Sequence, residues 1–93
     1  MTTLELPPHV DGPQVHDLRE QLRDALAAGP DVVLDCSRVE VLSAPGQALL
    51  LSTARAARRR GGLLVLRSPT EAMTHALRAT GLDLKVEQAT SRG

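Results

Sequence analysis

The chain has 93 residues, and its 11 acidic and 11 basic side chains give a formal net charge of zero at pH 7. A chain of this length forms one domain with a modest hydrophobic core. The balanced charge excludes a general affinity for nucleic acids or anionic membranes, and the absence of Phe, Tyr and Trp excludes the stacking surfaces that single-stranded nucleic acids require. We expect a single domain over residues 1–93, with an ordered core over residues 3–87 and a polar tail over residues 88–93.

The sequence contains no signal-peptide pattern and no apolar run long enough to cross a membrane. Its single cysteine, Cys36, cannot form an internal disulfide. These features predict a cytoplasmic protein that does not insert into a membrane.

Short apolar segments alternate with helix-length amphipathic segments along the chain. Residues 3–6 predict a first strand. Asp11 and Gln14 then match a capping box at the start of a helix, in which the aspartate accepts from first-turn amides and the glutamine reaches back. Apolar residues recur at helical spacing until Gly29 and Pro30, which end this helix.

The stretch from Asp31 to Pro69 carries the clearest pattern. Two short buried-strand segments, DVVLDCS and LLVLRSP, flank a helix-length stretch of Ala, Leu and Arg that ends at Gly61-Gly62. A strand, a crossover helix and a second strand form a βαβ unit, so the sheet must be largely parallel. The helix begins at a corner over residues 43–46, beyond the end of a strand, where α/β sheets usually carry their functional surface.

The last part of the chain predicts one more helix and one more strand. Ser68 and Glu71 match a second capping box, with Pro69 at the first helical position. Gly81 ends this helix, and residues 84–86 predict an edge strand. The order strand, helix, strand, helix, strand, helix, strand predicts an α/β fold with a mixed, mostly parallel four-stranded sheet and about three packed helices.

The joint order and spacing of these motifs resemble the STAS domain of bacterial anti-sigma factor antagonists and sulfate transporters. The core of that family reads strand, Asp-Leu-Ser, a hydrophobic pair, Asp-Ser-Ser-Gly, a Leu/Ala-rich helix, Gly-Gly and strand. Here LDCS over residues 34–37 resembles the Asp-Leu-Ser segment, and VL over residues 41–42 resembles the hydrophobic pair. Gly46 matches the motif glycine, and Gly61-Gly62 match the pair that ends the helix, so the resemblance covers nearly the whole chain.

The corner departs from the family pattern. In members that phosphorylation regulates, an Asp precedes the Ser or Thr that a kinase modifies. The resemblance places Ser43 at the Asp position and Ala44 at the acceptor position, while Pro45 replaces the second Ser and Gln47 replaces a usual Leu. Alanine has no hydroxyl, so the resemblance implies a domain without the usual phosphorylation switch. Ser43 predicts a helix N-cap, with a displaced phosphoacceptor as the alternative.

The resemblance implies a non-enzymatic module that docks to another protein. Its partner would be an anti-sigma kinase, a chemotaxis or other signalling component, or the ATPase of an ABC transporter. The predicted partner surface comprises the corner, the helix that follows and a nearby loop: Asp35, Ser37, Ser43, Ala44, Pro45, Gly46 and Gln47. Two alternatives stay open, namely an accessory subunit of a lipid-trafficking ABC transporter and a domain that binds a small molecule or nucleotide. Self-association also stays open.

This sequence contains residue types that carry out catalysis or bind metals in other proteins, but no motif brings them together. No Gly-x-Ser-x-Gly elbow is present, and no motif places a base beside a nucleophile. His9, His16 and His75 show no ligand spacing, and Cys36 has no second cysteine beside it. No glycine pattern matches a phosphate-binding loop. The sequence therefore predicts no catalytic residue, no metal and no cofactor.

A cluster of four arginines lies near the end of the second predicted helix: Arg55, Arg58, Arg59 and Arg60. Three of them share a helix face. The cluster has two interpretations. It is either a docking patch for an acidic partner, or a solvated last turn whose cations complement the negative end of the helix dipole.

Overall fold

The computed structural model describes residues 2–29, 31–80 and 85–87. Three helices and six strands follow one another in these residues: β1 (Thr2–Glu5), β2 (His9–Val10), α1 (Pro13–Ala28), β3 (Val32–Asp35), β4 (Val41–Leu42), α2 (Ala44–Arg59), β5 (Leu64–Arg67), α3 (Glu71–Thr80) and β6 (Lys85–Glu87). The predicted tail over residues 88–93 lies outside the described residues.

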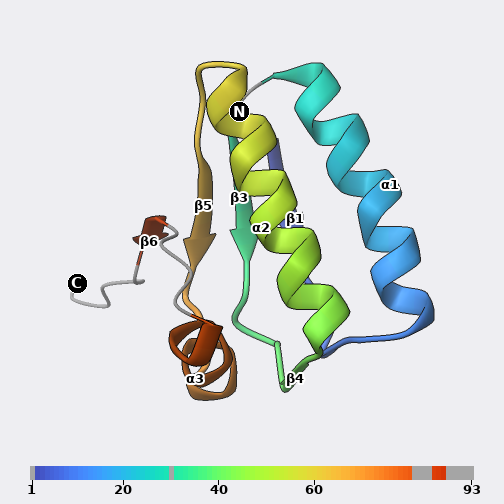
Figure 1. Ribbon diagram of the computed structural model, residues 1–93, viewed down its shortest axis with the longest axis vertical. Coiled ribbons are helices and arrows are strands. Elements are labelled where there is room, and N and C mark those ends of the chain that lie inside the picture. The colour runs from blue at the N-terminus through green and yellow to red at the C-terminus, as the bar shows by residue number, and fades with distance from the viewer. Residues whose placement is uncertain (1, 30, 81–84, 88–93) are drawn as a thin grey trace.

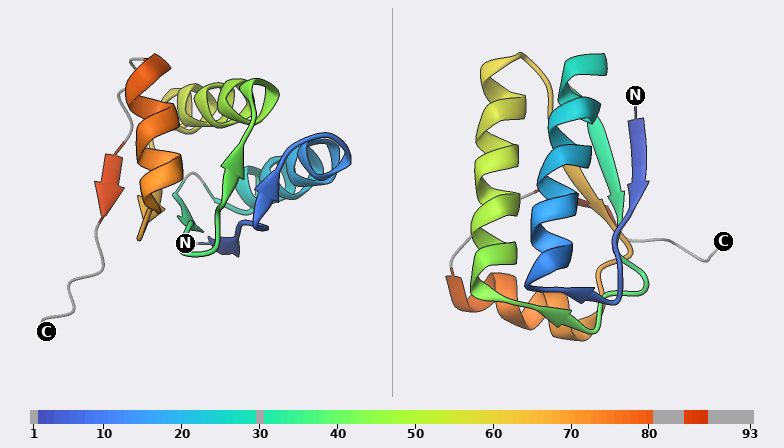
Figure 2. Two further views of the ribbon diagram at one scale, coloured as in Figure 1. Left: turned by 90° about the horizontal axis from the view of Figure 1, so that it is seen from below. Right: turned by 90° about the vertical axis from the view of Figure 1, so that its right-hand side faces the viewer.

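The main sheet has the strand order β1-β3-β5-β6, and each neighbouring pair is parallel. The predicted α/β fold, with a mostly parallel four-stranded sheet and three helices, is therefore confirmed, except that the described strands of this sheet contain no antiparallel pair, so the sheet is not mixed. Helices α1 and α2 lie side by side on one face of the sheet, while α3 lies at the end toward which β3 and β5 run (Figures 1 and 2). The last strand, β6, pairs with β5 at the edge as expected, and Gly81 and Leu84 lie outside the described residues.

A second, two-stranded sheet pairs β2 with β4, and sequence reasoning did not predict it. His9 lies opposite Val41 and Val10 lies opposite Leu42, in parallel register. Strand β2 directly precedes α1, and β4 directly precedes α2. This small sheet therefore ties together the starts of the two helices that cover the main sheet.

The core consists of aliphatic and sulfur-containing side chains from the sheet, the helices and the segments that join them. Its most deeply buried members are Leu6, Val10, Leu22, Val32, Leu34, Cys36, Val39, Leu50, Leu66 and Met73. Since the chain has no aromatic residue, all of the apolar burial that stabilises the fold comes from these smaller side chains.

The start of α1 differs from the predicted capping box. The N-cap residue is Gly12, with a φ of 51°, and no side chain caps the helix. Asp11 contributes its backbone carbonyl instead, which accepts a hydrogen bond from the amide of Gln14 (3.0 Å). The prediction was wrong because the chain turns into α1 through a left-handed residue, a conformation that glycine adopts at little cost. Asp11 consequently lies one residue too early to cap the helix.

The start of α3 was also predicted incorrectly. The hydroxyl of Thr70 accepts a hydrogen bond from the amide of Met73 (3.2 Å), and the Thr70 carbonyl accepts from the amide of Thr74 (2.9 Å). Thr70 is therefore the N-cap. Ser68, the predicted cap, has a φ of 54° and lies in the turn that precedes the helix. The helix thus begins two residues later than the sequence pattern indicated.

Candidate functional site

The corner over residues 43–46 leads from β4 into the first turn of α2, at the end of the sheet where α3 also lies (Figure 1). The hydroxyl of Ser43 accepts a hydrogen bond from the amide of Gly46 (3.2 Å), which confirms the predicted N-cap. The same hydroxyl donates to the carbonyl oxygen of Val10 (3.0 Å), and the Ser43 amide donates to that oxygen as well (3.0 Å). Ser43 therefore fastens the start of α2 to β2, the strand that precedes α1.

Gly46 lies where the first turn of α2 crosses the small sheet. A β-carbon at this position would come within 2.9 Å of the Val10 carbonyl oxygen and of Val10 Cγ1, and within 3.0 Å of Leu42 Cδ1. One of these atoms belongs to the backbone and cannot move without shifting β2. Close packing, rather than backbone conformation, therefore requires glycine here.

The corner has an exposed part, Ala44 and Pro45, whereas Gln47, which follows it, is held in place by a hydrogen bond. The side-chain amide of Gln47 donates to the carbonyl oxygen of Leu42 (3.2 Å), so Gln47 satisfies the end of β4. Ala44 and Pro45 are exposed at the start of α2, and Val41 is 43% exposed on β4. The exposed part of the corner is thus small and uncharged, and it offers no hydroxyl or titratable group for chemistry.

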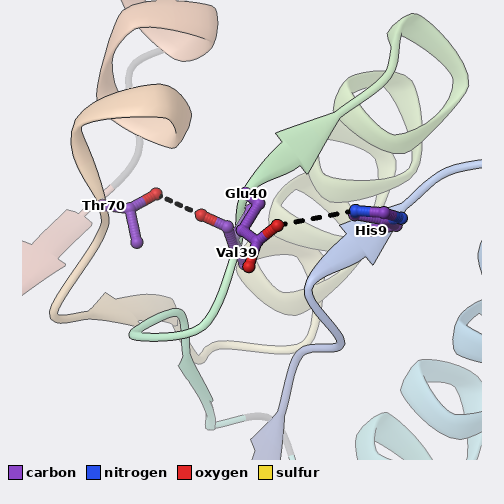
Figure 3. A network of polar contacts seen from close by, with 4 residues as sticks. All are labelled: His9, Val39, Glu40 and Thr70. Atoms are coloured by element: carbon purple, nitrogen blue, oxygen red, sulfur yellow. Dashed lines mark hydrogen bonds and ion pairs between the residues drawn. The ribbon is translucent and has the colours of Figure 1, made fainter.

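The connection from β3 to β4 is held from two sides (Figure 3). On one side, the hydroxyl of Thr70 donates to the carbonyl oxygen of Val39 (2.6 Å). On the other side, Glu40 Oε1 lies 3.6 Å from His9 Nε2, and the Glu40 amide donates to the carbonyl oxygen of Pro8 (2.7 Å). Sequence reasoning missed these contacts because they join residues about 30 positions apart, for which the sequence carries no local signal.

Asp35 and Ser37 form a separate turn after β3. Asp35 Oδ1 accepts a hydrogen bond from the Ser37 amide (3.0 Å). That bond is the main cause that lowers the pKa of Asp35; the Ser37 side chain and the charges of Arg67 and Arg38 act in the same direction. Among the described residues, no hydrogen bond or ion pair links Asp35 or Ser37 to the corner. A shared docking surface for the turn and the corner therefore stays a prediction.

Cys36 lies between these two residues but points into the core. Its side chain is fully buried, and its Sγ donates to the carbonyl oxygen of Leu34 (3.4 Å). Burial raises the pKa of the thiol to about 12, and the negative charge of Asp35 adds to this effect. Because the thiolate is the reactive form, Cys36 acts here as a small packing residue.

Metal ligands and membrane-spanning helices can be assessed over the parts of the chain that the structure describes. No group of three His, Cys, Asp or Glu side chains there is arranged to hold a metal ion. No helix in those parts is both long and apolar enough to span a bilayer.

Comparisons with known proteins agree with the architecture and with the motif order. The family model described as "Mlab, STAS domain" matches residues 1–87, which include the whole corner. A crystal structure of a candidate anti-sigma factor antagonist from Thermotoga maritima is similar, with a TM-score of 0.76 and 22% sequence identity over 97% of this chain and 75% of that chain. At this identity the likeness shows the fold. Among curated proteins, no sequence matches.

Proposed function

Because the chain belongs to the STAS domain family, we propose that it is a non-enzymatic docking module of the anti-sigma factor antagonist type, whose corner binds a protein partner. The observation that carries this proposal is the rigid corner with an exposed, uncharged tip. Ser43 and Gly46 fix its backbone, while Ala44 and Pro45 are left exposed. A surface that is already ordered loses little conformational entropy when a partner binds.

The surroundings of the corner also suit a protein interface. Val41 adds an exposed aliphatic side chain beside the tip, and the exposed pair His9 and Glu40 lies next to it. An apolar centre with a polar rim is the usual anatomy of a protein interface. We place the exposed side of α2 in the same surface, with Asp35 and Ser37 at its margin.

We further propose that this domain lacks the phosphorylation switch of its regulated relatives. Ala44 has no oxygen that could accept a phosphoryl group. The hydroxyl of Ser43 both donates to Val10 and accepts from Gly46, so phosphorylation of Ser43 would remove the proton that bonds to Val10 and thereby disturb the attachment of the helix start to β2. Partner binding would then be constitutive, with control through the partner or through the amount of protein.

We propose a signalling partner, such as an anti-sigma kinase or a chemotaxis component; a transporter ATPase is the alternative and would use the same corner. A nucleotide phosphate is less well supported. The first-turn amides of α2 that would bind it are partly occupied, because those of Gly46 and Gln47 donate to Ser43. The corner also has no aromatic side chain on which a base could stack.

Substitution of Ala44 by Asp tests the proposal. The new carboxylate suits a helix N-terminus but introduces charge at the centre of the proposed interface, so we expect intact folding and about tenfold or greater loss of partner affinity. The partner is first captured from native lysate and identified by mass spectrometry, and its binding constant is then measured by titration calorimetry. Its identity separates a signalling role from a transport role.

Gln14→Asp provides the matched control, because it places the same carboxylate at an exposed position in the first turn of α1. This variant should bind the partner as the parent does. If Ala44→Asp also binds like the parent, the corner is not the interface. If both variants lose affinity equally, added negative charge rather than its position is responsible.

A further inference from the structure

A groove of about 390 Å³ lies between α1 and α2, the two helices that run side by side in Figure 1. The buried leucines Leu22 and Leu26 of α1 and Leu49 of α2 line it, together with small side chains of α2 such as Ser52. The small side chains of Ala48, Ser52 and Ala56 recur one turn apart along α2, so they leave room between the two helices. The three leucines are themselves at most 8% exposed, so the accessible floor of the groove consists of the small side chains of α2, with only the edges of the leucines beneath them.

Four arginines line the same groove: Arg19 and Arg23 from α1, and Arg59 and Arg60 from the end of α2. Arg19 and Arg23 are four residues apart and thus share one face of their helix. None of the lining residues is acidic. Among the described residues, no carboxylate lies within ion-pair distance of Arg19, Arg23, Arg59 or Arg60. A protein with no net charge thus gathers four positive charges around one apolar groove.

The structure divides the arginine cluster that the sequence suggested. Arg59 and Arg60 line the groove, whereas Arg55 and Arg58 do not. Arg60 Nη1 also donates to the carbonyl oxygen of Leu26 in the last turn of α1 (2.9 Å), so it joins the ends of the two helices. Its positive charge is held in place at the groove rather than free in solvent.

The excess of positive charge decreases from the groove toward the corner. A neighbouring hollow next to Pro45 is lined by Arg19 and Arg23 together with Asp11 and Glu20. Those two carboxylates offset the arginines there. The uncompensated charge is therefore concentrated where α1 faces the last turns of α2.

We propose that the groove is a second docking surface, separate from the corner, which binds an acidic amphipathic helix of a partner protein. A narrow apolar stripe on such a helix would lie over the small side chains of α2 and the exposed edges of the leucines, as in other helix-in-groove complexes. Carboxylates on both sides of the stripe would meet the arginines, whose planar forks bind carboxylates in a bidentate manner. An anionic membrane fits less well, because a flat surface would not enter the groove between the two helices.

The test uses a fluorescein-labelled peptide of about 20 residues, roughly 30 Å as a helix, with Leu at helical spacing and Glu on both flanks. Fluorescence anisotropy measures its binding to the parent and to two double variants. We expect saturable binding to the parent that weakens as salt rises. Arg19→Glu/Arg23→Glu should bind about tenfold more weakly, since several arginine–carboxylate attractions become repulsions.

Arg55→Glu/Arg58→Glu is the matched control, because it makes the same change in net charge on α2 but outside the groove lining. It should bind the peptide within about twofold of the parent. Equal losses in both double variants would show that only total charge matters and would overturn the proposal. Equal binding of a peptide with Gln in place of every Glu, or no saturable binding, would overturn it too.

Two further measurements complete the test. Vesicles that contain phosphatidylglycerol are offered to the same proteins. The proposal is overturned, and the groove contacts membranes instead, if two results occur together. The vesicles bind the parent but not Arg19→Glu/Arg23→Glu, and the peptide does not bind the parent. Ala44→Asp, which changes the corner, should bind the peptide as the parent does. The proposal for the corner and the proposal for the groove can therefore fail independently of each other.

Discussion

The corner and the arginine groove both involve α2, but they are built in different ways. At the corner, hydrogen bonds from Ser43 and the close contact of Gly46 with Val10 set the position of the backbone, and little side chain is exposed. At the groove, long exposed side chains such as Arg19 and Arg23 carry the surface. The corner would therefore recognise a partner by shape and the groove by charge. Changes at the corner should affect stability as well as binding, whereas changes at the groove should affect binding alone.

The largest expected effect on stability is that of Gly46→Ala. In an ordinary helix, alanine is more favourable than glycine by about 1 kcal/mol. Here the new methyl group would lie 2.9 Å from the Val10 carbonyl oxygen, and overpacking of this kind typically costs about 1–3 kcal/mol. We therefore expect a net loss of stability, measured as a lower midpoint of urea unfolding at an unchanged slope.

Gly29→Ala is the control for this experiment. Gly29 has an extended backbone with a φ of 173°, and a β-carbon there would meet nothing within 4 Å. Its replacement should change stability by no more than about 0.5 kcal/mol. If Gly46→Ala proves as stable as Gly29→Ala, the start of α2 can shift, and the corner is not defined by its backbone.

Substitutions of Ser43 should have the next largest effect. Ser43→Ala removes the N-cap and should cost about 0.5–2 kcal/mol, whereas Ser43→Thr keeps a hydroxyl that can both donate and accept. Capping preference alone would make Ser43→Asp neutral, but an ionised Asp cannot donate to the Val10 carbonyl oxygen. Ser43→Asp should therefore fall between Thr and Ala in chemical denaturation. An Asp variant as stable as the parent would show that the bond to Val10 contributes little.

The sequence predicted most of the fold because its strongest signals are local. Buried apolar runs separated by a helix-length segment require parallel pairing, and the structure has that pairing. At the corner, the cap at Ser43 and the need for Gly46 were also recognisable, the first from N-cap preference and the second from the motif. The strand and helix pattern and the cap depend on residues close together in the chain, whereas the need for Gly46 comes from the distant Val10 and was indicated only by the motif.

The features that sequence reasoning missed depend on contacts between distant residues. Strands β2 and β4 have two residues each, too few for an alternating pattern. The caps expected at Asp11 and Ser68 failed because left-handed residues, Gly12 and Ser68 itself, redirect the chain before each helix. The groove unites arginines from two helices, and their spacing along the chain does not reveal that these helices pack side by side.

The smallest expected effect on stability is that of Arg19→Glu/Arg23→Glu. Both side chains are exposed and have no ion-pair partner among the described residues, so the free energy of unfolding should change by no more than about 0.5 kcal/mol. In the parent these charges repel Arg59 and Arg60 across the groove and are offset by Asp11 and Glu20, whereas in the variant they attract the two arginines and repel the two carboxylates. Since these effects oppose each other, the free energy of unfolding of the variant relative to the parent should change little between low salt and about 1 M salt. Urea denaturation at the two salt concentrations measures the difference. A loss of more than about 1 kcal/mol would mean that the arginines hold α1 and α2 together, and the contrast between a structural corner and a purely binding groove would then fail.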